Sequence, residues 1–326
     1  MNFRITFTLF VLLSYLNAEP TWFNNIPKKE YEFISYGVGS SFEEASAIAK
    51  AEIASYIRSD VISKLSIKSS EINDESNEEV KSEISSVSNI SLYGVKTIKR
   101  EEIKDRYFVA LKYDLRAFET KFVEKIGSNK KCTKKRSFLN NSLFGESLRT
   151  LVNCDLDLSI YEKGGTLFIS NNNISMPWDK NDIETLFVEK QDIDLHFTAS
   201  KFILKDNEAF KLILKSNKQG GYLSLFNIYN QGEVALLVDN IPNSFGKTIK
   251  IPDAINESLE LVASTEGKDN TKDLYIAVWH EKKLSLSIFD MTSDETLSNN
   301  SNKNLSELIK ILDKNSYSSF VVRISK

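Results

Sequence analysis

The chain has 326 residues, of which 41% are hydrophobic and 27% charged, and its formal net charge is −3. This composition is ordinary for a globular protein and excludes a disordered or fibrous chain. A broad nucleic-acid surface needs a basic bias, so we expect no nucleic-acid partner. The length suits two domains, each large enough to bury a core.

Residues 1–18 have the pattern of a secretory signal peptide. Arg4 precedes an apolar run over residues 5–13, and the stretch ends on the small residue Ala18. A positive start, an apolar stretch of about 7–15 residues and a small-residue exit are typical of a signal that is removed on export. If the leader is retained, it serves as an inner-membrane anchor instead. No later stretch reaches the roughly 20 apolar residues of a membrane span.

Residues 19–127 are expected to form a small layered α/β domain. A strand over residues 32–38 ends in a glycine turn, and Ser41 with Glu44 predicts a capping box at the start of a long helix. A second helix over residues 80–90, two strands and a closing helix follow, with bounds at 91–101, 107–114 and 116–126. The long helix carries an apolar stripe with alanines that allow close packing on a sheet: Ala45, Ala49, Ile53, Ile57, Val61 and Leu65.

Residues 128–190 are expected to connect the two domains. They begin as a basic loop, continue as a short helix over residues 142–153 and end in a helical stretch over 181–190. The two cysteines of the chain, Cys132 and Cys154, both lie here and are the disulfide candidate, because an exported protein meets an oxidising compartment. The alternative is a pair of free thiols.

Residues 191–326 are expected to form a mainly antiparallel, sandwich-like β domain. Short apolar alternations recur at regular spacing, which favours an antiparallel sandwich over a parallel sheet. Residues 222–229 and 233–238 predict a hairpin around Gly232, where glycine takes the left-handed conformation. One late helix is expected over residues 305–312, with Asn304 and Glu307 in a capping arrangement. The fold class is therefore α+β.

No motif predicts a catalytic or cofactor-binding residue. Gly37-Val38-Gly39 follows a strand, but Phe42 stands where a dinucleotide fingerprint needs its third glycine. Gly246-Lys247-Thr248 leads into a strand pattern, whereas a phosphate loop needs the N-terminus of a helix. We therefore expect a protein that is not an enzyme and carries no cofactor.

The candidates for metal binding fail on their spacing. Asp269, Thr271 and Asp273 alternate like calcium ligands, but the central glycine and the last glutamate of a calcium loop are missing. His196 and His280 are the chain's two histidines, and neither has a Cys or His partner at ligand spacing. The sequence predicts no metal site.

The first domain resembles the LPP-20 lipoprotein family of bacterial envelopes, which includes relatives of flagellar outer-membrane-associated proteins. The residues that carry the resemblance are Pro20-Thr21-Trp22-Phe23, the turn at residues 36–41, the alanine-rich helix 44–57 and Tyr107-Phe108-Val109-Ala110-Leu111. The chain departs from the family at residues 14–18, which hold no cysteine to acylate. A lipid anchor is therefore not expected.

The second domain resembles a bacterial domain of unknown function, DUF-4384. The matching residues are the Gly-Tyr-Leu strand at 220–226, the Gly-x-Val turn and strand at 232–237, Asp239-Asn240 and Ile251-Pro252. Neither resemblance supplies catalytic residues.

These features predict an exported, non-enzymatic scaffold or binding protein of the bacterial envelope, periplasmic or associated with the outer membrane. By family analogy it would assist assembly of that membrane or of a flagellum-like organelle. Its partners would be envelope proteins, a cell-wall polymer or further copies of itself. The alternative is a glycan- or peptide-binding accessory subunit or enzyme, in which Trp178, Tyr229 and Trp279 stack on sugar rings. The other interpretation of these aromatic residues is that they complete the core.

Overall fold

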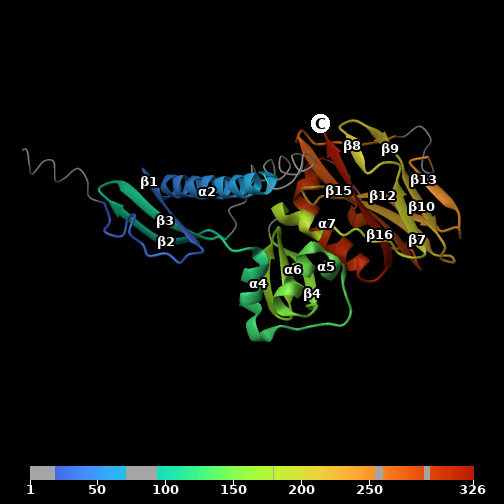
Figure 1. Cartoon of the computed structure of the whole chain (residues 1–326), viewed down its shortest axis with the longest axis horizontal. Coiled ribbons are helices and arrows are strands. Elements are labelled where there is room, and N and C mark those ends of the chain that lie inside the picture. Colours follow the sequence, from blue (N-terminus) through green and yellow to red (C-terminus); the bar gives the residue numbers. More distant parts are fainter. Residues whose placement is uncertain (1–18, 71–93, 179, 254–259, 290–293) are drawn as a thin grey trace, which may run out of the picture. The chain divides into compact units, whose positions relative to one another are not determined.

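The computed structural model describes residues 19–70, 94–178, 180–253, 260–289 and 294–326 (Figure 1). The α+β fold class with mostly antiparallel sheets is confirmed. The described residues divide into two compact units, one ending at Arg116 and one beginning at Ala117. The expected signal peptide and the expected helix over residues 80–90 lie outside the described residues.

The first unit is a three-stranded antiparallel sheet with a long helix on one face (Figure 1). Its strand order is β1-β3-β2. The helix packs its alanine stripe on the sheet, as its spacing predicts, and Ala45 and Ala49 are buried against Val109 and Leu111. The elements are β1 (Glu32–Gly39), α2 (Phe42–Ser70), β2 (Lys96–Ile103) and β3 (Arg106–Asp114).

The start of α2 differs from a capping box in one bond. The Ser41 hydroxyl accepts the Glu44 backbone N–H at 3.1 Å, as expected. The Glu44 carboxylate, however, accepts the backbone N–H of Ser40 at 2.6 Å. The carboxylate therefore closes the turn one residue before the N-cap. Hydrogen bonds from the Ser40 hydroxyl, at 2.6 Å, and from the Ser40 backbone N–H lower the pKa of Glu44.

The helix expected to close the first domain packs in the second unit. Helix α4 (Phe118–Ile126) buries Phe122 and Ile126 in a core shared with later elements. The expected boundary at residue 127 is thus corrected to the junction between Arg116 and Ala117. The physical reason is that the apolar side of this helix faces residues that come after it in the chain.

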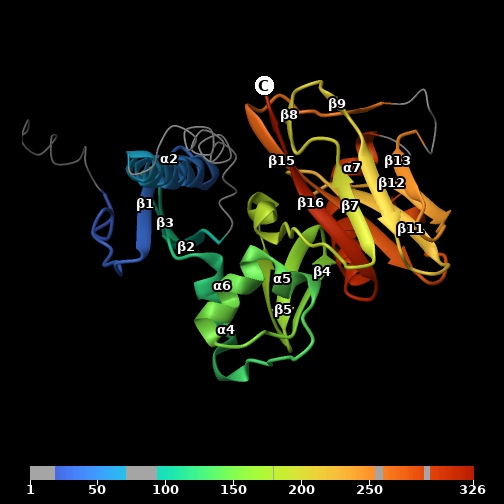
Figure 2. The same ribbon diagram turned by 45° about the vertical axis from the view of Figure 1, so that its right-hand side comes forward.

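The centre of the second unit is a five-stranded sheet in the order β12-β11-β15-β16-β8 (Figure 2). One face packs on a three-stranded sheet in the order β13-β10-β7, which gives the expected sandwich. The predicted hairpin is formed by β11 and β12, with Gly232 at φ +84°. The strands are β7 (Leu195–Ala199), β8 (Ile203–Lys205), β9 (Ala209–Phe210), β10 (Leu212–Ser216), β11 (Tyr222–Ile228), β12 (Val234–Pro242), β13 (Thr248–Ile251), β14 (Leu261–Val262), β15 (Asn270–His280) and β16 (Ser316–Ser325).

The other face of this central sheet is also covered. Residues expected to be a connecting segment supply much of a second core there, together with the last helix. Residues 128–190 are therefore not a linker but part of the second unit. They form the 3-10 helix η3 (Gly127–Asn129), α5 (Phe138–Asn141), α6 (Leu143–Val152), a small sheet of β4 (Leu158–Lys163), β5 (Thr166–Asn171) and β6 (Ile174–Trp178), and the 3-10 helix η4 (Lys180–Leu186).

Two expected elements near the C-terminus are corrected. The late helix α7 (Asp294–Leu312) begins well before residue 305, so Asn304 lies inside the helix and does not cap it. The alternation over residues 284–288 gives a 3-10 turn, η5 (Ser287–Phe289), where Leu286 and Phe289 point into the second core. The alternation of Leu284, Leu286 and Ile288 predicted the burial of Leu286, but it predicted neither the burial of Phe289 nor the backbone conformation.

Cys132 and Cys154 are joined by a disulfide, with their Cα atoms 6.0 Å apart. Backbone hydrogen bonds flank it, from Thr133 N–H to Asp155 O and from Asp157 N–H to Lys131 O, each at 2.8 Å. The bridge ties the basic loop before α5 to the entry of β4.

Replacing both cysteines by serine is expected to lower the free energy of unfolding by about 3 kcal/mol, because the unfolded chain regains the freedom of a 22-residue loop. Urea unfolding of the wild type and of C132S/C154S measures the difference. Reducing agent should destabilise the wild type and leave the double variant unchanged. Equal midpoints for the two proteins would contradict a stabilising bridge.

Candidate functional site

The residues singled out by sequence do not meet in one site. Asp269 pairs with Lys326 at 2.9 Å, while Thr271 and Asp273 are buried on β15. In the described part of the chain, no group of three His, Cys, Asp or Glu residues is placed to hold a metal ion. Nor does any described helix have the length and apolar character of a membrane span.

The aromatic residues considered for sugar stacking serve mainly in packing. Trp178 is buried in the second core. Trp279 is partly buried, and its indole N–H donates to the Gly220 carbonyl at 3.0 Å. Tyr229 lies beside buried Asp273, and burial raises its pKa.

His280 forms a buried pair with Ser224. Its Nδ1 lies 2.8 Å from the Lys282 carbonyl and therefore carries the proton, so Nε2 accepts from the Ser224 hydroxyl at 3.0 Å. The same hydroxyl accepts the Asn240 backbone N–H at 3.1 Å, where the β11–β12 ladder has a bulge. Ser224 is 0% exposed and His280 1% exposed. The pair resembles a nucleophile and its base, but it is sealed from any substrate and serves to complete the bulge.

The candidate site is an interruption in the outer edge of the central sheet. On β16, Ser319, Val321 and Arg323 turn their backbone N–H groups outward. Ser319 exchanges two hydrogen bonds with Lys190, at 2.7 and 3.0 Å, and the Arg323 N–H donates to Phe202 O at 2.9 Å. Between them the Val321 N–H meets only a side chain, the Glu189 carboxylate, at 3.4 Å.

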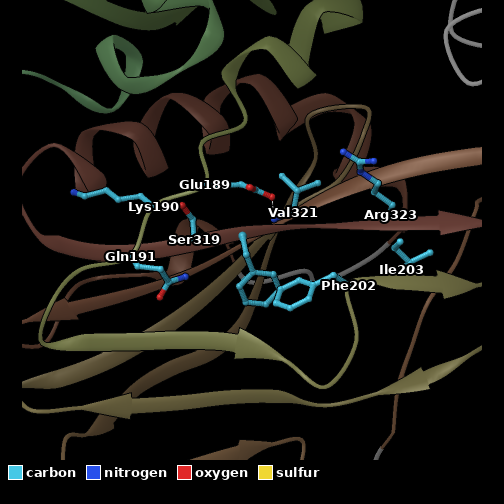
Figure 3. Close-up of a pocket in the computed structure, with 9 residues that line it drawn as sticks. Glu189, Lys190, Gln191, Phe202, Ile203, Ser319, Val321 and Arg323 are labelled. Atoms are coloured by element: carbon cyan, nitrogen blue, oxygen red, sulfur yellow. Dashed lines mark hydrogen bonds between the residues drawn. The ribbon is translucent and has the colours of Figure 1, made fainter. Parts of the chain in front are cut away.

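This interruption is a groove of about 510 Å³, which we call the β16 edge groove (Figure 3). Its volume lies in the range of small-ligand sites. From Ser319 to Arg323 it spans about 13 Å of extended backbone. Its lining residues are Glu189, Lys190, Gln191, Phe202, Ile203, Ser319, Phe320, Val321 and Arg323.

The groove exposes apolar surface beside these backbone groups. Ile203 is 72% exposed and Phe202 47% exposed. The ring of Phe202 packs edge-on against the Phe320 ring, with centroids 5.4 Å apart, so the apolar surface continues toward the core. Natural sheets usually avoid exposed apolar side chains beside an unpaired edge amide, so we take this groove as the candidate site.

The charged residues of the groove differ in their exposure to solvent and in their contacts. Lys190 points away from the other lining residues (Figure 3), and its ammonium lies 3.9 Å from the centre of the Tyr317 ring. Burial lowers the pKa of Lys190 and raises that of Tyr317 to about 12. The side chains of Glu189 and Arg323 are exposed, and the Glu189 carboxylate accepts the Val321 N–H.

The sequence did not predict this groove. Its walls come from three segments that lie far apart in the chain, residues 189–191, 202–203 and 319–323. The sequence of each segment is that of an ordinary loop or strand. The one local signal is the apolar run Phe202-Ile203-Leu204 between Lys201 and Lys205, of which only Leu204 is buried.

No protein-family model, curated protein or solved structure matches the chain. The resemblances to the LPP-20 and DUF-4384 families therefore stay predictions.

Proposed function

We propose that this is an exported, non-catalytic binding protein of the cell envelope that holds an extended segment of a partner protein in the β16 edge groove. The observation that carries the proposal is that the Val321 backbone N–H has no backbone partner on the sheet edge. The neighbouring edge residues, Ser319 and Arg323, do have backbone partners, whereas the Val321 N–H donates only to the Glu189 carboxylate at 3.4 Å. A backbone carbonyl of an incoming segment would replace the Glu189 carboxylate there.

Two further features support the proposal. The exposed Phe202 and Ile203 supply apolar contact area next to the backbone bond, and strand addition combines these two kinds of contact. The disulfide is consistent with an oxidising compartment outside the cytoplasm.

A capped ten-residue peptide of alternating valine and threonine, labelled with a fluorophore, tests the proposal. We expect fluorescence anisotropy to show saturable binding to the purified protein. Ile203→Thr is expected to weaken binding about tenfold, because it removes apolar area worth about 1.4 kcal/mol while keeping a β-branched residue. Hydrogen exchange at the Val321 amide should slow when the peptide is bound.

Val262→Thr is the matched control, since Val262 is 48% exposed on β14 and does not line the groove. It should bind the peptide like the wild type. Absence of binding, or equal loss in both variants, would refute the groove as a peptide site.

A further inference from the structure

Strand β1 is one edge of the three-stranded sheet in the first unit, and its outer side offers unpaired backbone groups. Every second residue of β1 bonds to β3, so Ile34, Tyr36 and Val38 turn their backbone groups away from the sheet. The Tyr36 N–H donates to the Glu52 carboxylate of α2 at 3.2 Å, in agreement with this direction. Within the described part of the chain, the outward backbone groups of Ile34 and Val38 have no hydrogen-bond partner.

The two edges of this sheet differ in how they are protected against pairing with another strand. The opposite edge, β2, carries five charged residues and has an irregular register between Thr97 and Lys99. Strand β1 has one charged residue, Glu32, contains no proline and pairs with β3 in a regular register along its whole length. Charges and bulges are what natural sheets use to prevent edge pairing, so the sheet is protected at β2 and open at β1.

Helix α2 places apolar side chains beside this open edge. Ile48, Glu52 and Tyr56 follow each other at intervals of four, so they lie along one side of the helix. Glu52 reaches the outer amide of β1, and the Tyr56 ring stacks on the Phe33 ring with centroids 4.1 Å apart. This side of α2 therefore runs along β1. Ile48 is 46% exposed there and Tyr56 39% exposed.

We infer that two copies of this chain join through their β1 edges, as antiparallel strands related by a two-fold axis at Tyr36. In this register Ile34 of one copy lies opposite Val38 of the other, and each outward amide meets a backbone carbonyl. The same patch serves both copies, as a two-fold interface requires. The two sheets would continue into one, with the two α2 helices side by side on the same face.

The charges near this edge favour a second copy as the occupant. In the proposed register Phe33 of one copy lies opposite Gly39 of the other. The Lys28 ammonium lies 5.9 Å from the centre of the Phe33 ring. The Glu44 carboxylate accepts the backbone N–H of Ser40, the residue after Gly39, at 2.6 Å. Lys28 of each copy would therefore approach Glu44 of the other, which gives two attractive charge pairs.

Glu52 opposes this pairing and limits it. Its carboxylate holds the Tyr36 N–H, which a carbonyl of the second copy would take over. In the pair, the two Glu52 carboxylates would lie near the axis and repel each other. A charge beside an otherwise open edge is a common protection against uncontrolled pairing. Neutralising Glu52 should therefore tighten the dimer.

Sedimentation velocity of the full chain over a range of concentrations tests the inference. We expect a reversible equilibrium between monomer and dimer, and hydrogen exchange in peptides from β1 should slow as the dimer forms. Val38→Pro is expected to weaken the dimer at least tenfold, because it removes an outward N–H that the monomer does not use. Glu52→Gln is expected to tighten the dimer about tenfold, because it removes the like charges at the axis.

Glu102→Pro is the matched control, since residue 102 alternates with the β2 residues that bond to β3 and turns its N–H outward on the opposite edge. It should leave the dimer unchanged. The inference is wrong if the wild type stays monomeric up to about 0.5 mM protein, if both proline variants weaken the dimer equally, or if Glu52→Gln weakens it. Peptide binding in the β16 edge groove does not depend on any of these outcomes.

Discussion

Gly37→Ala is expected to unfold the first unit while the second unit stays folded. A Cβ atom at residue 37 would lie 1.8 Å from the backbone oxygen of Ala45 and 3.0 Å from the backbone nitrogen of Ala49. Both atoms belong to the backbone of α2, so no side chain can rotate away. The helix would have to lift off the sheet and expose Ala45, Ala49 and Ile53, which are buried there.

We expect the free energy of unfolding of the first unit to fall by about 3 kcal/mol or more, which is the upper end for an overpacked core. A loss of this size is enough to unfold a small unit. Hydrogen exchange read by mass spectrometry separates the two units. Peptides from β1 and β3 should lose protection in the variant, and peptides from β11 and β15 should keep it.

Ser35→Ala on the same face of β1 is the matched control. Ser35 is buried, and its hydroxyl has no hydrogen-bond partner among the residues that the structure describes, so its removal should leave stability unchanged or raise it. Wild-type exchange rates in Gly37→Ala would show that α2 does not need to approach β1 so closely.

Asp273→Asn is expected to stabilise the second unit by up to about 4 kcal/mol at pH 8 and by little at pH 4. Asp273 is 5% exposed, and burial raises the pKa of its carboxyl to about 7 despite hydrogen bonds from Asn227 and the backbone of Asn230. Nearby Glu266 raises this pKa and Lys268 lowers it. Its usual pKa is 3.8, so the folded state binds a proton more tightly than the unfolded state does.

This difference in pKa decides how the stability of the wild type changes with pH. Between pH 3.8 and about 7 the folded carboxyl keeps its proton while the unfolded one ionises, so wild-type stability from this group falls as the pH rises. Above pH 7 the loss is complete. An asparagine does not titrate, so the advantage of the variant grows over this window and then stays constant.

Urea unfolding from pH 4 to pH 8 measures the difference between variant and wild type at each pH. Buried His280 has a lowered pKa and costs stability as the pH falls below about 6.5, but this contribution is common to both proteins and cancels. Asp269→Asn, at an exposed ion pair with Lys326, should show no comparable gain. A difference that does not vary with pH would mean that Asp273 is ionised in the fold.

Helix α2 and the β11–β12 hairpin were predicted from residues that lie close together in the sequence. The spacing of four in residues 45–53 predicted which side of α2 is buried, because a helix returns to the same face at that interval. The hairpin at Gly232 followed from its turn residues. The pairing of Cys132 with Cys154 was one of two readings that the cysteine count allowed, and the structure contains the bridge.

The sequence pattern did not show which strands bury side chains on both of their faces. In β15 the residues Leu274, Ile276 and Val278 face the core with α7, whereas Tyr275 and Ala277 face the sandwich. An alternation of buried residues identified the strand but did not show that the positions between them are buried as well. That second core is what draws α4 and residues 128–190 into the second unit.

The sequence by itself determined the class of the fold, the helix stripe of the first unit, the hairpin and the lack of a recognisable catalytic motif, because each depends on residues close together in the chain. Only the tertiary structure decided where the units divide and which edge of the central sheet is left open. The β16 edge groove exists because residues 189–191, 202–203 and 319–323 leave one edge amide, that of Val321, without a strand beside it. Whether an edge is covered depends on long-range pairing, which no local pattern encodes.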